Sequence, residues 1–164
     1  MKLHVANFFD APRLTGVAGE AIPEGSVILL FGSNAAGERV FKAVTNGQSA
    51  LLVNGNYGVA LKISKEPNAV ASSTAPASFG DRTVTIVSGD LITQVKRGAI
   101  LEYSVSLLHD SLNPNTAGTL PVAGAALGIV GGKFCSAGTG SAITSPVIGR
   151  CLDIIGSKVR IELV

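Results

Sequence analysis

Short apolar segments rich in β-branched residues recur along this sequence, and glycine, asparagine or proline closes nearly all of them. This pattern predicts β-strands, because Gly and Asn readily adopt the turn conformations that follow a strand. We expect strands at residues 27–31, 40–44, 58–63, 83–87, 99–105, 125–130, 147–152 and 158–164. The last of these alternates polar and apolar residues, which indicates one buried and one solvated face.

Helix signals are weak throughout the chain. No segment keeps apolar residues at the spacing of one helix face between recognisable caps. The best candidate, residues 107–112, is followed at once by Asn113-Pro114 and amounts to a single turn of helix. We therefore predict an all-β fold: a compact β-barrel or sandwich-like domain of short strands with long loops.

The length of 164 residues fits one domain. We expect an extended N-terminal arm over residues 1–20 and a single β domain over residues 21–164. Within that domain, residues 64–82 are expected to form a protruding loop and residues 131–146 a flexible Gly-rich loop.

A weak internal repeat links two parts of the sequence. Residues 24–29 resemble residues 97–101, and residues 58–63 resemble residues 149–154 in sharing the pattern Gly-x-x-Leu-x-Ile. The repeat is explained either by a duplication or by a small β-barrel that reuses a turn-then-strand pattern.

The chain carries little charge. Charged residues make up 15% and hydrophobic residues 46%, whereas about 25% charged residues is usual for soluble domains. The deficit indicates a surface partly covered by another protein. A net charge of +2, spread along the chain, gives no footprint for nucleic acid, and no apolar run reaches the length of a membrane span. We expect neither nucleic acid nor membrane as a partner.

The first ten residues meet charge too early to form a secretory signal. In a reducing cytoplasm, Cys135 and Cys151 are expected to be free, buried thiols rather than a disulfide.

Candidate catalytic and metal motifs fail on spacing. Residues 109–111 read His-Asp-Ser, but adjacent residues cannot converge on one substrate atom, so a solvated turn is expected. Residues 138–141 read Gly-Thr-Gly-Ser without the spacing and following helix of a phosphate loop. Cys135 and Cys151 lack the close pairing of zinc ligands. We predict no catalytic, cofactor-binding or metal-binding residues, and a protein that is not an enzyme.

Two residue pairs are candidates for partner binding. Phe8 and Phe9 lie in the expected N-terminal arm, where aromatic side chains can anchor an interface or instead pack into the protein's own core. Lys96 and Arg97 form the only adjacent basic pair, which suits an acidic patch on a partner or a solvated turn.

Six short segments together follow a recognisable order. They read Pro-Glu-Gly-Ser-Val-Ile-Leu (23–29), Gly-Val-Ala-Leu (58–61), Lys-Arg-Gly-Ala-Ile-Leu (96–101), Ala-Leu-Gly-Ile-Val (126–130), Val-Ile-Gly-Arg-Cys-Leu (147–152) and Val-Arg-Ile-Glu-Leu (159–163). This order resembles the small capsid decoration (cement) proteins of tailed bacteriophages. The resemblance covers residues 21–63 and 94–164, and it leaves out the insertion at 64–82 and the segment at 2–15.

The resemblance implies a structural virion protein without catalytic residues or cofactor. Such a subunit binds the major capsid protein on the capsid exterior after assembly in the host cytoplasm, stabilises contacts between capsid subunits, and is expected to be a homotrimer. One alternative is another phage component, such as a tail, spike or head-completion subunit. A second is a small β-barrel enzyme or ligand-binding module whose pocket assembles from Asp90, Glu102, His109 and Asp153.

Overall fold

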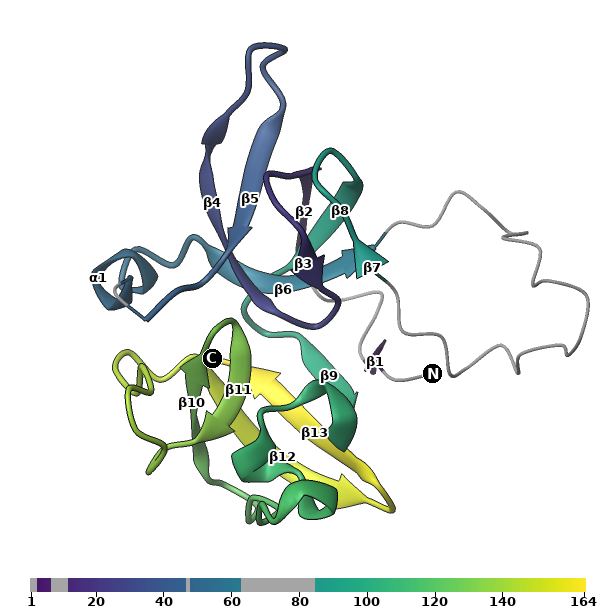
Figure 1. Cartoon of the computed structure of the whole chain (residues 1–164), viewed down its shortest axis with the longest axis vertical. Coiled ribbons are helices and arrows are strands. Elements are labelled where there is room, and N and C mark those ends of the chain that lie inside the picture. The colour runs from purple at the N-terminus through teal and green to yellow at the C-terminus, as the bar shows by residue number, and fades with distance from the viewer. Residues whose placement is uncertain (1–2, 7–11, 47, 63–84) are drawn as a thin grey trace, which may run out of the picture.

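The computed structural model describes residues 3–6, 12–46, 48–62 and 85–164 (Figure 1). The predicted all-β class is confirmed. The strands are β1 (Leu3–Val5), β2 (Arg13–Ala18), β3 (Ile22–Pro23), β4 (Val27–Ser33), β5 (Arg39–Ala43), β6 (Tyr57–Lys62), β7 (Thr85–Ile86), β8 (Leu91–Val95), β9 (Ile100–Ser104), β10 (Ala126–Val130), β11 (Lys133–Ser136), β12 (Gly149–Ile155) and β13 (Lys158–Leu163). Short helical turns are α1 (Ser49–Leu52), η1 (Val105–Leu107), η2 (Asp110–Leu112) and η3 (Pro114–Thr116).

Five strands close into a barrel in the order β2-β5-β4-β6-β8. Only the β2–β5 pair is parallel; the other barrel pairs are antiparallel. Because successive side chains point to opposite faces of a strand, alternate residues fill the interior. This inner core consists of Ala18, Ile28, Phe41, Ala60 and Ile92 of the barrel strands, together with Ile22 and Ile86 of the two-stranded sheet β3-β7.

The second part of the molecule is a six-stranded antiparallel sheet in the order β1-β9-β13-β12-β10-β11. In its strand β13, Val159, Ile161 and Leu163 are buried while the intervening polar residues are half-buried. The alternation predicted for this strand is therefore confirmed.

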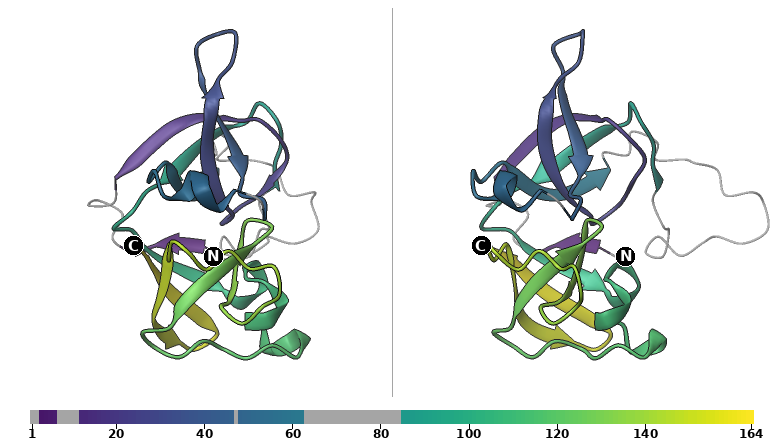
Figure 2. Two further views of the ribbon diagram at one scale, coloured as in Figure 1. Left: turned by 90° about the vertical axis from the view of Figure 1, so that its left-hand side faces the viewer. Right: turned by 60° about the vertical axis from the view of Figure 1, so that its left-hand side comes forward.

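The barrel and the sheet share one core. Val27, Leu29, Val59 and Val95, on the alternate positions of barrel strands, belong to the same buried cluster as Leu101, Ile161 and other sheet residues. Main-chain bonds also cross the junction, since the Val27 N–H donates to the Gly132 carbonyl at 2.7 Å. In both views of Figure 2 the barrel lies directly over the sheet.

The described parts of the expected N-terminal arm are extended but paired. Strand β1 forms one edge of the sheet beside β9, and β2 closes the barrel between β5 and β8. The β fold therefore begins before residue 21, and removing residues 1–15 would cut into a barrel strand. The sequence analysis missed strand β2 because its apolar pattern is weak. The strand is held by main-chain pairing with β5 and β8, which leaves no pattern in the sequence.

The expected flexible loop at 131–146 is in part a strand. It contains β11, whose Phe134 and Cys135 are buried, and Ile143, which bridges to Ile129 of β10. Burial of these apolar side chains orders the segment despite its glycines. The expected protruding loop at 64–82 lies outside the described residues.

The strand order does not follow the internal repeat. Barrel strands β4 and β6, which carry the first copy, are neighbours, whereas β9 and β12, which carry the second, are separated by β13. What the copies share is the turn before the strand, where Gly25 and Gly98 have φ of +83° and +87°. Reuse of a turn-then-strand pattern is sufficient to explain the repeat.

Candidate interaction surface

His109 and Ser111 form a structural cap. The Ser111 N–H donates to His109 Nδ1 at 3.1 Å, and the Ser111 hydroxyl accepts a bond from the Ser136 N–H at 3.0 Å. These bonds close the turn η2 and fasten it to strand β11. The segment was expected to be a solvated turn. Both side chains are instead half-buried, because η2 lies against strand β11 of the sheet.

The four dispersed polar residues of the enzyme alternative do not meet in one pocket. Asp90 lies in the barrel and pairs with Lys62 at 2.9 Å. Glu102 and Asp153 lie in the sheet on either side of Arg160, which donates to the Asp153 carboxylate through Nε at 2.6 Å. His109 caps η2.

Two of these residues, Asp90 and Asp153, are held in ion pairs. The Lys62 ammonium and the Val87 N–H hold the pKa of Asp90 below its ordinary value, and the Arg160 guanidinium does the same for the pKa of Asp153. Both groups are therefore ionised at neutral pH rather than poised as proton donors. Among the described residues, no three His, Cys, Asp or Glu side chains are placed to hold a metal ion.

Both cysteines are free and buried, as expected. Burial raises the pKa of the Cys135 thiol, and burial together with the nearby Asp153 carboxylate raises the pKa of the Cys151 thiol. A thiol with a raised pKa is a poor nucleophile and a poor metal ligand, because both roles need the thiolate.

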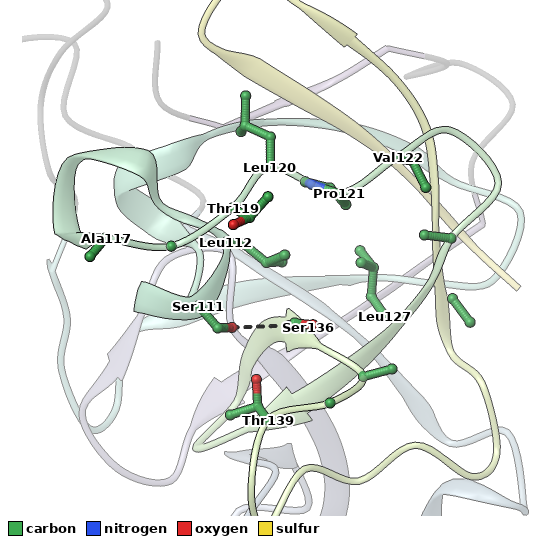
Figure 3. A pocket seen from close by; sticks show the side chains of 15 residues that line it. Ser111, Leu112, Ala117, Thr119, Leu120, Pro121, Val122, Leu127, Ser136 and Thr139 are labelled. Atoms are coloured by element: carbon green, nitrogen blue, oxygen red, sulfur yellow. Dashed lines mark hydrogen bonds between the residues drawn. The ribbon is translucent and has the colours of Figure 1, made fainter.

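An open groove of about 630 Å³ runs beside η2 and β10 (Figure 3). None of its lining residues carries a charge; they are Ser111, Leu112, Ala117–Val122, Ala125–Leu127 and Ser136–Thr139. Figure 3 shows Leu112 and Leu127 directed toward its middle, and Val122 at its rim is 73% exposed. The loop that superficially resembled a phosphate loop thus contributes Gly138 and Thr139 to an uncharged groove.

A β-hairpin projects from the other end of the molecule. We define the projecting hairpin as residues 31–39, the exposed ends of β4 and β5 with the turn between them. It stands clear of the barrel in all the views of Figures 1 and 2. Phe31 at its base is 56% exposed, and the Lys42 ammonium lies 4.2 Å from the centre of its ring.

The predicted partner-binding residues have different outcomes. Phe8 and Phe9 lie outside the described residues. Lys96 and Arg97 form the turn that connects barrel strand β8 to sheet strand β9; the Lys96 N–H donates to the Pro12 carbonyl at 2.9 Å, and Arg97 is exposed. Their placement before a strand is confirmed, and their role toward a partner stays a prediction.

Sequence reasoning missed Phe31 and Val122 as exposed apolar residues. Phe31 was placed at the end of a strand, and Val122 lies in a segment without strand pattern. Asn34 is a turn-forming residue and signals the turn of the hairpin, but the sequence has no signal for the exposure of Phe31.

Comparisons with known proteins add no relative to this picture. No family model matches the chain, and neither the curated proteins nor the solved structures give a match. Within the described residues, no helix has the length and apolar character needed to cross a membrane.

Proposed function

We propose that this protein is a capsid decoration (cement) subunit of a tailed bacteriophage. It binds the outer surface of the capsid and stabilises contacts between neighbouring major capsid proteins, without catalysis or a cofactor. A homotrimer suits this role, because trimers match the local threefold points of an icosahedral lattice.

The segments that resemble decoration proteins support the proposal by their position. They supply β4 and β6, which are neighbours in the barrel, and β9, β13, β12 and β10, which are four consecutive strands of the sheet. Segments far apart in the sequence thus form one framework.

The observation that carries the proposal is that exposed apolar side chains lie at opposite ends of one molecule, among others in the described residues (Leu51, Val53, Val87, Leu91, Ile154 and Ile155). Phe31 marks the projecting hairpin, and Val122 marks the uncharged groove beside the sheet. A protein that clamps its neighbours needs two such contacts and a framework between them that does not yield. The shared core of barrel and sheet supplies that framework, and exposed apolar patches are typical of protein interfaces.

The groove favours one alternative, a module that binds a small uncharged ligand. Its volume lies in the range of small-molecule sites, about 300–1,000 Å³. Its open shape and the absence of any titratable lining residue fit an apolar protein segment better than a ligand that must be oriented by polar groups.

The proposal is tested by a pelleting assay with capsids depleted of their decoration protein. We expect binding to saturate at a copy number that matches the lattice symmetry and to raise the melting temperature of the capsids. Capsids that keep their own decoration protein are the control and should take up none. Absence of binding to depleted capsids would overturn the proposal in favour of a tail, spike or head-completion role, which labelling of whole virions would then locate.

A further inference from the structure

The projecting hairpin adds no side chain to the buried cores. Every residue from Phe31 to Arg39 is exposed, and none belongs to either buried core. The barrel β2-β5-β4-β6-β8 closes through the parts of β4 and β5 that lie outside the hairpin. A projection that buries no apolar side chain contributes little to stability, and its side chains are available for a contact outside the folded body.

The hairpin is rigid before it meets a partner. Gly32 pairs with Val40 and Ser33 with Arg39 across its two strands. At the turn, the Asn34 carboxamide oxygen accepts bonds from the Ala36 and Glu38 N–H groups, both at 3.0 Å, and its Nδ2 donates to the Glu38 carboxylate at 2.8 Å. A preformed element has less conformational entropy to lose on binding than a flexible loop.

A β-bulge exposes Phe31. The register between β4 and β5 shifts between Leu30 and Gly32, so Phe31 is the extra residue of the bulge. Bulges re-aim side chains at the ends of sheets, and here the ring is more than half exposed with the Lys42 ammonium over its face. The cation–π contact favours this orientation of the ring, and aromatic side chains, Phe included, are enriched at interfaces.

The charges around Phe31 indicate the chemistry of its partner. Within the described residues, neither Lys42 nor Arg39 forms an ion pair with a carboxylate. Two carboxylates at this end have other partners: Glu38 accepts from Asn34, and Glu20 accepts from the Ala43 N–H at 2.9 Å. A surface that fits this end of the molecule therefore combines an apolar depression with an acidic side chain beside it.

Two clefts among the described residues do not offer that combination. The groove beside η2 has no acidic residue. A second cleft of about 450 Å³ at the base of the hairpin has one, Glu38, and its carboxylate is already bonded to Asn34. Charge complementarity thus favours a different protein over a second copy of this chain.

We propose that the projecting hairpin is the element by which this protein binds the major capsid protein. In this complex Phe31 lies in an apolar depression of the capsid protein and Lys42 faces a capsid carboxylate. This inference rests on the proposed function and adds to it the binding element and the chemistry of the capsid site.

The test measures the affinity of the full chain and its variants for depleted capsids. Phe31→Ser should weaken binding at least about tenfold, the usual loss at an anchor residue. Val53→Ser removes a 70% exposed apolar side chain from the residue that follows α1. This variant is the matched control and should bind like the wild type. Lys42→Glu should weaken binding more than Lys42→Met, and Lys42→Met should reduce the salt dependence.

A second variant guards against misfolding at the bulge. Ala35→Asp places a negative charge on the exposed turn without touching the Asn34 bonds, so it should weaken binding to an acidic site while the melting temperature of the free protein stays unchanged.

The outcomes are distinguishable. If the wild type does not bind capsids, the proposed function is wrong, and so is the proposed role of the hairpin. If the wild type binds and both Phe31→Ser and Ala35→Asp bind equally well, only the proposed role of the hairpin is overturned. If the variants lose self-association in sedimentation but bind capsids normally, the hairpin is a contact between copies, which also overturns the inference.

Discussion

The two tyrosines of this chain join the barrel to the sheet from opposite directions. Tyr57 of barrel strand β6 donates its hydroxyl proton to the carbonyl of Val164, beyond the end of sheet strand β13. Tyr103 of sheet strand β9 donates to the Gly25 carbonyl, before barrel strand β4, at 2.9 Å. Each is a bond between residues far apart in the sequence, and neither had a signal in the sequence.

Removing the Tyr103 hydroxyl should be costly. In Tyr103→Phe the ring keeps its edge-to-face contact with Phe134, whose centroid lies 5.7 Å away, but the buried Gly25 carbonyl loses its donor. We expect a loss of about 1–3 kcal/mol in the free energy of unfolding, measured by urea denaturation. Ser106→Ala, which removes an exposed hydroxyl from a bond to Ser104, is the control and should change little. An unchanged denaturation midpoint for Tyr103→Phe would contradict a stabilising role of the Tyr103–Gly25 hydrogen bond.

The two buried thiols should be unreactive in the folded protein. Burial raises the pKa of Cys135 and Cys151 above their ordinary value of 9.0, and neither side chain is accessible. At pH 8 a thiol-specific disulfide reagent should label neither residue in native buffer and both in denaturant, with the Cys135→Ala and Cys151→Ala variants assigning each signal. Rapid labelling of the native protein would show that the sheet opens locally.

The same shifts have a consequence for stability in alkaline solution. Because the folded-state pKa values are raised, the unfolded chain ionises first as pH rises. The contribution of the two thiols is therefore complete below pH 9.0 and is lost as pH rises toward the folded-state values. Alanine at both positions should remove this part of the pH dependence.

At the scale of elements, close approach of strands explains why glycine occupies Gly58 of β6. A Cβ there would lie 2.4 Å from the Val95 carbonyl oxygen and 2.5 Å from Gln94 Cγ of the neighbouring strand β8. Backbone cannot yield as a flexible side chain does, so Gly58→Ala should separate β6 from β8 and lower the free energy of unfolding by about 1–3 kcal/mol. Gly138→Ala is the matched control, since its Cβ would meet open space. Equal midpoints in chemical denaturation would contradict this explanation.

The elements predicted from sequence are those with a short apolar run, or an alternation of polar and apolar residues, next to turn-forming residues. Strands β4, β5, β6, β9, β10, β12 and β13 were all expected near their observed positions. Strand β8 was missed because Thr93 and Gln94 are polar although buried; Gln94 Nε2 donates to the Ile28 and Asn56 carbonyls inside the barrel. Strand β11 was missed because it is short and lies among glycines.

The candidate surfaces were less predictable than the strands. The groove joins the segment around η2 to residues 136–139, and only the tertiary fold brings them together. Exposure of Phe31 follows from a register shift between β4 and β5, which depends on the pairing of two strands and has no periodic pattern. The placement of Lys96 and Arg97 before a strand was predictable because adjacent charges are visible in the sequence itself, and their role toward a partner stays a prediction.

At the scale of the whole molecule, the chain builds two β units around one continuous core. The inner barrel core is closed off, but the outer barrel residues Val27, Leu29, Val59 and Val95 bury their side chains in the same cluster as the sheet. Neither unit covers this apolar surface alone. Burial at the junction is consistent with the low charge of the sequence.

The shared core predicts that barrel and sheet unfold together. Tyr57 reports on the barrel and Tyr103 on the sheet, and the chain has no tryptophan to obscure them. We expect tyrosine fluorescence of the Tyr57→Phe and Tyr103→Phe variants, each with one remaining probe, to show a transition that coincides with the circular dichroism of the same variant. Each hydroxyl deletion shifts its own midpoint, so the comparison is made within a variant. If the Tyr57 signal and the circular dichroism of the Tyr103→Phe variant separate, the barrel and the sheet are independent units, and the junction is too weak to serve as the framework of a clamp.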